Sequence, residues 1–85
     1  MKFDYYKPKE SDFFDLAKGK TIRVFTKFLH GSECFVYAGI LEKKGKDFIY
    51  LRDGKVFKVE DEKEKEIKSF QRVALSKTII SFVEF

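Results

Sequence analysis

The stretch 20–29, KTIRVFTKFL, decides the fold class because its residues alternate between two faces. One face carries Ile22, Val24, Thr26 and Phe28. The other face carries Thr21, Arg23, Phe25, Lys27 and Leu29. A period of two is typical of a β-strand, whose successive side chains point to opposite sides of the sheet. We therefore predict a long strand from Lys20 to Leu29.

A short helix is predicted before this strand, from Ser11 to Gly19. Its apolar side is supplied by Phe13, Phe14, Leu16 and Ala17. Gly19 tolerates the left-handed backbone conformation that commonly closes a helix, and the period changes from helical to alternating after it. Residues 1–10 are interpreted as an amino-terminal extension, and residues 11–85 as one folded domain.

A second strand is predicted from Cys34 to Leu41, after a turn cluster at residues 30–33. Glycine inside a strand is typical of a sharp bend or of a close approach of two backbones, so Gly39 predicts one of these. Residues 42–46 form a Lys-rich turn around Gly45.

A third strand begins at Phe48, and its course beyond Leu51 has two interpretations. Asp53 and Gly54 tolerate the positive φ angles of a tight hairpin turn. Alternatively, the strand continues through a bulge at this dipeptide and ends at Val59.

The last part of the chain predicts a charged hairpin tip and two more strands. Residues 60–66 contain five acids and two lysines, a composition typical of a solvated tip. The strands are Ile67 to Leu75 and Thr78 to Phe85, separated by a tight corner at Ser76 and Lys77. One short helix and five strands predict a mainly β protein: a strongly bent five-stranded antiparallel sheet closed into a small barrel.

The final strand, Thr78 to Phe85, carries apolar residues on both faces. Alternation places Ile79, Val83 and Phe85 on one face and Ile80 and Phe82 on the other. A free edge on such a strand is an aggregation hazard. We expect the edge strand of another copy to cover it in a closed ring.

The composition excludes several classes of protein. A chain of 85 residues allows one domain and excludes a large enzyme. Hydrophobic residues make up 44%, enough for a compact core, which excludes a disordered tail. Eighteen Lys plus Arg against fourteen Asp plus Glu give a net charge of +4, which permits a polyanionic partner.

Catalysis and membrane insertion are not expected from these residues. The single cysteine, Cys34, has no internal disulfide partner and is interpreted as a small buried group. The single histidine, His30, does not build a common zinc site alone. We predict a protein that is not an enzyme and holds no cofactor or metal. Since no apolar stretch reaches the roughly 20 residues of a membrane helix, we also expect a cytoplasmic protein without a membrane partner.

Several motifs accompany the order of elements. They are Gly19-Lys20 before Ile22 and Val24; Gly39-Ile40-Leu41; Ile49-Tyr50-Leu51 before Asp53; and Val73 to Lys77 before Ile79, Ile80 and Val83. Over roughly Asp12 to Val83 this pattern resembles the Sm and Sm-like family, which includes bacterial Hfq. Two features depart from the family pattern. The third loop offers Gly45, Lys46, Asp47 and Phe48 where uridine-binding members usually carry an Asp and an Asn, and Ser76-Lys77 replaces an Arg-Gly corner.

The resemblance implies a homo-oligomeric ring, a hexamer or heptamer, that binds single-stranded RNA near its pore through the third loop and the corner. In such rings the fourth strand of one subunit pairs with the fifth strand of the next. The RNA-binding residues predicted on this basis are Lys46, Asp47, Phe48, Ser76 and Lys77. Lys46 and Lys77 supply charge for phosphate, and Phe48 supplies a ring for base stacking.

Two alternatives to RNA binding stay open. The first is an Sm-like or SH3-like barrel that acts as a protein-interaction or structural module, which the missing family residues favour. The second is a monomeric SH3-like barrel that binds duplex DNA, which the basic charge permits.

Overall fold

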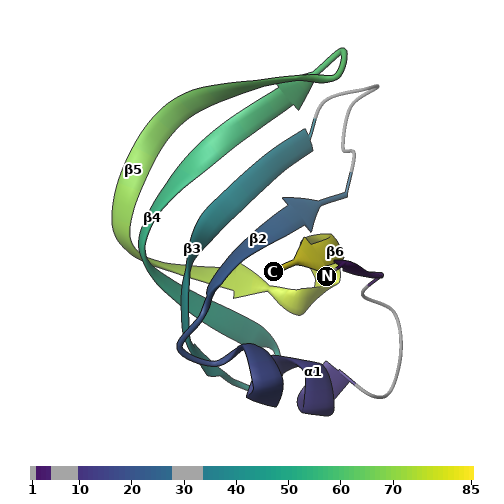
Figure 1. The fold of residues 1–85 in the computed structure, drawn as a ribbon, viewed down its shortest axis with the longest axis vertical. Helices are drawn as coiled ribbons and strands as arrows, with labels where there is room; N and C mark the ends of the chain where they lie inside the picture. Colours follow the sequence, from purple (N-terminus) through teal and green to yellow (C-terminus); the bar gives the residue numbers. More distant parts are fainter. Residues whose placement is uncertain (1, 5–9, 28–33) are drawn as a thin grey trace.

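The computed structural model describes residues 2–4, 10–27 and 34–85, with side chains from Phe14 onward, and it is mainly β (Figure 1). Within these described residues, one helix and six strands follow one another, with a 3₁₀ turn before the last strand. They are β1 (Lys2–Asp4), α1 (Glu10–Ala17), β2 (Thr21–Thr26), β3 (Cys34–Lys44), β4 (Phe48–Glu60), β5 (Lys63–Ser76), the 3₁₀ turn (Lys77–Ile79) and β6 (Ile80–Glu84).

The strands form one antiparallel sheet in the order β1-β6-β2-β3-β4-β5. The five predicted strands are confirmed as β2 to β6, and the sheet adds the short β1. In β1, Phe3 lies opposite Val83 of β6. Part of the predicted amino-terminal extension therefore joins the sheet, and the outer edge of β6 is paired within the same chain.

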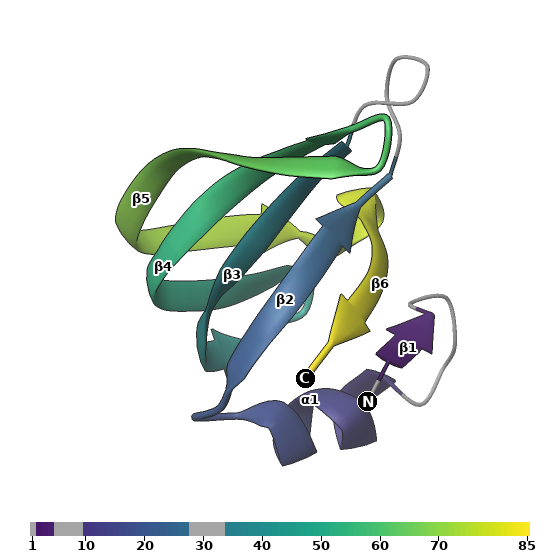
Figure 2. The same ribbon diagram turned by 45° about the horizontal axis from the view of Figure 1, so that its top comes forward.

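The sheet does not curl strongly and does not close into a barrel, so this part of the fold prediction is wrong. Among the described strands, the order ends at β1 on one side and β5 on the other (Figure 2). Closure requires β5 to reach the outer edge of β6. That edge pairs with Lys2–Asp4 instead, so the backbone groups that would close the barrel are already used.

The predicted helix is present and closes as expected. Gly19 has φ +83°, and the Lys20 N–H donates to the Ala17 carbonyl at 2.9 Å. Of the apolar residues, Phe14 and Ala17 are buried against the core, whereas Leu16 is 66% exposed. The Gly19 N–H also donates to the Leu41 carbonyl at 2.8 Å, which ties the end of the helix to β3.

The core lies on one face of the sheet and under α1. It consists of Phe14, Ala17, Ile22, Val24, Leu41, Ile49, Leu51, Leu75, Ile80 and Val83. The alternation predicted for β2 is confirmed, and the buried face is the one with Ile22, Val24 and Thr26, while Phe28 lies outside the described residues. The buried Thr26 hydroxyl donates to the Phe35 carbonyl at 3.1 Å and accepts from the Phe35 N–H at 3.0 Å.

The last strand departs from simple alternation. Ile80 and Val83 are both fully buried, although they were predicted on opposite faces. The pairing of β6 with β2 changes register between Phe25 and Thr26, because Phe25 lies opposite Phe82 and Thr26 opposite Ile80. The extra residue of this bulge brings Ile80 and Val83 to the same side. Phe82 faces the other way and stacks on Phe25, with ring centroids 4.3 Å apart.

Asp53 and Gly54 form a bulge inside β4, and not a hairpin turn. Asp53 has φ +50°, and the register with β3 shifts between Ala38 and Ile40. The close approach of backbones predicted at Gly39 is confirmed, and its partner is Gly54. A Cβ atom on Gly54 would lie 2.9 Å from the Gly39 Cα, 2.5 Å from Cζ of Phe70, and in severe conflict with the Ala38 carbonyl.

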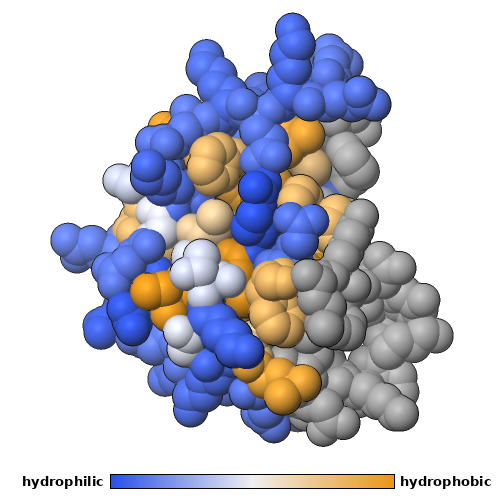
Figure 3. All heavy atoms as spheres, in the orientation of Figure 1, coloured by the Kyte–Doolittle hydropathy of each residue, from blue (hydrophilic) through white to orange (hydrophobic). Residues whose placement is uncertain are grey.

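The hairpin between β4 and β5 ends in the predicted charged tip. Its turn is formed by Asp61 and Glu62, both with positive φ. Glu64 forms an ion pair with Arg23 of β2, and Figure 3 shows this end of the molecule as largely hydrophilic. Polar contacts therefore hold the tip.

Substituting Gly54 with Ala is expected to lower the free energy of unfolding by about 2 to 3 kcal/mol, because a methyl group here forces the backbone of β3 or β4 to move. Gly45→Ala is the matched control. A Cβ atom on Gly45 would lie 3.4 Å from the Phe48 carbonyl oxygen, and we expect a change within about 0.5 kcal/mol. Urea unfolding of both variants measures the difference. Equal stabilities would contradict the close approach.

Candidate nucleic-acid interface

Two turns that are distant in sequence lie side by side at one end of the β4–β5 ladder. One joins β3 to β4, and the other is the 3₁₀ turn after β5. Phe48 lies directly opposite Ser76 in the ladder, and the Lys77 N–H donates to the Asp47 carbonyl at 2.8 Å. Lys46 precedes Asp47 in the first turn. The structure thus brings together the residues predicted from the sequence as an RNA-binding site.

Local hydrogen bonds fix the shape of both turns. The Gly45 N–H donates to the Phe48 carbonyl at 2.7 Å, which closes the first turn. The Ser76 hydroxyl accepts from the Thr78 N–H at 3.3 Å and lies 2.8 Å from the Thr78 hydroxyl. Ser76 has extended backbone angles, φ −66° and ψ 133°, so it caps the 3₁₀ turn.

The site presents one ring and several polar groups to solvent. Phe48 is 43% exposed, since the period of two buries its neighbour Ile49 and turns Phe48 to the outer face. We call this the outer face of β4: the side opposite Ile49 and Leu51. Lys46 and Asp47 are exposed, and Lys77 is half-buried. The arrangement offers one stacking surface flanked by two cations and a carboxylate.

Tyr50 extends this site and was missed as a site residue. It lies two residues after Phe48 in β4, on the same outer face. Lys43 Nζ lies over the Tyr50 ring, 4.9 Å from its centroid, which is cation–π geometry. The sequence signal was the spacing of the two aromatic residues in one strand.

The Lys-rich turn does not converge on the site as one cluster. Lys43 and Lys44 belong to the end of β3, and the turn itself covers residues 45–47. Lys44 Nζ pairs with the Asp15 carboxylate of α1 at 3.3 Å. Lys43 contacts Tyr50, and Lys46 remains in the turn. The three lysines, which lie within four residues of sequence, therefore have different surroundings.

Other reactive residues do not contribute to this site. Cys34 is buried, and burial together with the charge of Glu64 raises the pKa of its thiol. The thiol therefore stays protonated at neutral pH. His30 lies outside the described residues, and those that are described hold no group of three or more His, Cys, Asp or Glu spaced to bind a metal. No described helix is long and apolar enough to cross a membrane.

Compared with known proteins, the chain matches no protein-family model and no curated protein. The resemblance to the Sm family accordingly stays a prediction based on the motifs named above.

Ser76→Ala is expected to lower the free energy of unfolding by about 1 kcal/mol, because it removes the acceptor for the Thr78 N–H. Thr78→Val keeps that acceptor and removes only the contact between hydroxyls, so its effect should be about half as large. Urea unfolding of the two variants tests the cap. A larger loss for Thr78→Val than for Ser76→Ala would contradict it.

Proposed function

We propose that this protein is a non-enzymatic Sm-like protein that binds single-stranded RNA and assembles into a homo-oligomeric ring of six or seven subunits. The observation that carries the proposal is the contact between the two turns, in which Phe48 lies opposite Ser76 and the Lys77 N–H donates to the Asp47 carbonyl. The order of elements also supports it: a helix closing at Gly19-Lys20, five further strands, and a charged tip where β4 turns into β5.

Each residue of the site has a defined chemical task in this proposal. Phe48 stacks on a base, which contributes about 1 to 3 kcal/mol per base in other proteins. Lys46 and Lys77 neutralise phosphates, and the Asp47 carboxylate accepts a hydrogen bond from a base N–H. The Ser76 hydroxyl caps the second turn through Thr78, and the Lys77 N–H holds that turn against the first by donating to the Asp47 carbonyl. One subunit offers few contacts, and repeating them around a ring raises the overall affinity through multivalency.

Ring assembly makes one demand on the sheet. The outer edge of β6 has to pair with β5 of the next copy, and β1 pairs with this edge at Phe82 to Glu84. Assembly therefore requires β1 to leave the edge. β1 has only three residues and therefore few backbone hydrogen bonds with β6. A longer strand from another copy can replace these hydrogen bonds.

A protein-interaction module is the second candidate function. Leu16 favours it, because this leucine is 66% exposed on α1 although the helix is short and packs its other side on the core. The Ser76-Lys77 corner favours it as well, since it stands where RNA-binding family members carry Arg-Gly. In this reading the same assembly docks another protein without RNA.

Phe48→Ala is expected to weaken binding to a fluorescent oligouridine about tenfold, because the stacking surface is lost. Ile67→Ala is the matched control, since Ile67 is 45% exposed on β5 and far along the ladder from the site, and it should leave the affinity unchanged. Anisotropy at low and moderate salt measures the affinity, which should fall steeply as salt rises. Absence of binding to oligouridine and to oligoadenine at low salt would remove the RNA proposal.

The double variant Phe3→Pro, Asp4→Pro is expected to form the ring at a lower protein concentration than the wild-type chain. Proline has no backbone N–H, so β1 cannot pair normally with β6. Phe3→Ala, Asp4→Ala keeps both N–H groups and should behave like the wild-type chain. Light scattering over a concentration series gives the mass. A mass near 10.1 kDa for all three proteins at every concentration would exclude the ring.

A further inference from the structure

A polar hollow lies on the β4–β5 ladder, four residues along β4 from Phe48. It is lined by Arg52, Asp53, Gln71 and Arg72. Arg52 and Arg72 are direct partners in the β4–β5 ladder. Like charges directly opposite each other on neighbouring strands repel. Two guanidinium groups at one register position therefore favour an anion between them.

Two carboxylates partly compensate this repulsion. Arg52 Nη1 lies 2.7 Å from Asp53 Oδ2, and Arg72 Nη2 lies 3.5 Å from Glu42 Oε2. The second pair reaches across β4, since Glu42 belongs to β3 and Arg72 to β5. The Arg72 side chain is 78% exposed. Exposed ion pairs contribute little, so a phosphate oxygen can replace Glu42 at Arg72.

The guanidinium groups retain donors for a ligand. Each carries five N–H donors in a planar fork, and the two ion pairs use one terminal nitrogen of each arginine. Planar forks of this kind match the oxygen spacing of a phosphate and bind it with two parallel hydrogen bonds. The amide of Gln71 adds a neutral donor to the lining.

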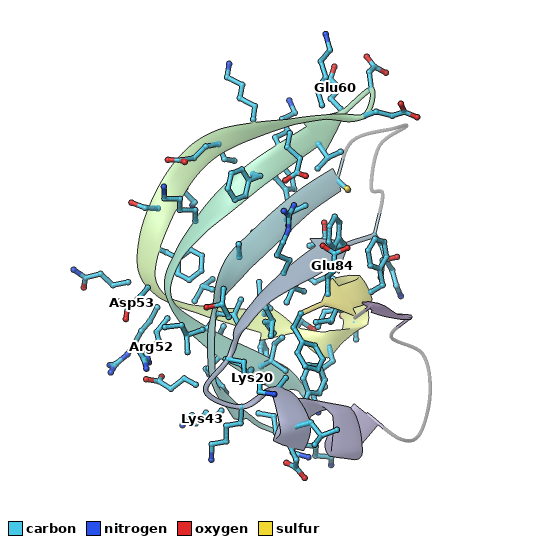
Figure 4. The ribbon with its side chains drawn as sticks, viewed as in Figure 1. Lys20, Lys43, Arg52, Asp53, Glu60 and Glu84 are labelled. Atoms are coloured by element: carbon cyan, nitrogen blue, oxygen red, sulfur yellow. The ribbon has the colours of Figure 1, made fainter. Side chains whose placement is uncertain are left out.

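The bulge in β4 holds the hollow in place. Asp53 is in the left-handed region, with φ +50°, and the next residue, Gly54, packs against the β3 backbone at Gly39. Figure 4 shows Arg52 and Asp53 projecting together away from the sheet where β4 bends. A bulge commonly redirects side chains beside a functional site.

The hollow continues the outer face that carries the aromatic residues. Phe48, Tyr50 and Arg52 alternate with the buried Ile49 and Leu51. The rise of a strand separates Phe48 from Arg52 by about 13 Å. A single RNA strand whose base stacks on Phe48 thus reaches the hollow after passing Tyr50.

We infer that the hollow between Arg52 and Arg72 binds a backbone phosphate of the single-stranded RNA that the two turns hold. The RNA as ligand rests on the proposed function. The hollow is a separate contact, so its removal and the removal of the stacking residue have different consequences.

The test compares Arg52→Gln, Arg72→Gln with Lys65→Gln, Lys68→Gln, a control that removes the same charge from the far half of β5. The probe is an oligouridine of about 12 nucleotides, titrated at about 50 and about 200 mM salt. The arginine variant should bind about tenfold more weakly at the lower salt, and the slope of log affinity against log salt should fall by about 0.7 for the phosphate contact that is lost. The lysine variant should change the affinity by less than about twofold and leave the slope as in the wild-type protein. Phe48→Ala should weaken binding without changing the slope.

A second arm titrates the wild-type protein with inorganic phosphate and follows backbone amide resonances by NMR. Shifts confined to residues 52–54 and 71–72, and lost in the arginine variant, are expected. An unchanged salt slope in the arginine variant, with Phe48→Ala still defective, would overturn the inference and leave the proposed function intact. Amide shifts with inorganic phosphate but no binding of the oligouridine would indicate a site for free anions. That result would overturn both the inference and the proposed function. Absence of both responses would overturn the inference as well.

Discussion

The close contact between Gly39 and Gly54 is the constraint on which the rest of the structure depends. β4 runs alongside β3, and at Gly54 the two backbones come too close for a side chain. A Cβ atom on Gly54 would conflict with the Ala38 carbonyl and with Phe70. Since the strand passes through, β4 and β5 stay paired from Glu60 to Phe48. The pairing at Phe48 in turn places the two turns beside each other. A hairpin at Asp53 would have separated them.

Local sequence patterns predicted the helix and the strands well. The features that depend on pairing between distant segments were not predicted correctly. Alternation in 20–29 predicted a strand and its two faces, and the helix with its glycine closure followed from the change of period. The prediction of a closed barrel was wrong because Lys2–Asp4, a segment too short for its pattern to indicate a strand, pairs with the edge of β6. The assignment of β6 residues to two faces was wrong because one bulged residue shifts the alternation. Such a bulge depends on the pairing with the partner strand, which the sequence of β6 does not indicate.

The predicted site shows the same division. Lys46, Asp47, Phe48, Ser76 and Lys77 were selected by likeness to a family pattern, and the ladder brings both segments together. Tyr50 was visible as a neighbour of Phe48 on one face, yet its contact with Lys43 requires the register of β3 against β4. The pairing of Arg52 with Arg72 joins residues twenty positions apart, and nothing local in either strand indicates it.

The distribution of buried residues along the β4–β5 hairpin divides it into two mechanical parts. Near the turns, Ile49, Leu51 and Leu75 anchor the ladder in the core. From Glu60 to Ser69 every residue is exposed, so this part of β5 is held by backbone hydrogen bonds and surface ion pairs, while its β4 partner strand is anchored by the buried Val56. Segments of that kind open at low free energy while the rest of a domain stays folded. The molecule thus combines a base that is anchored in the core, where the two turns meet, with an exposed arm that has few core contacts.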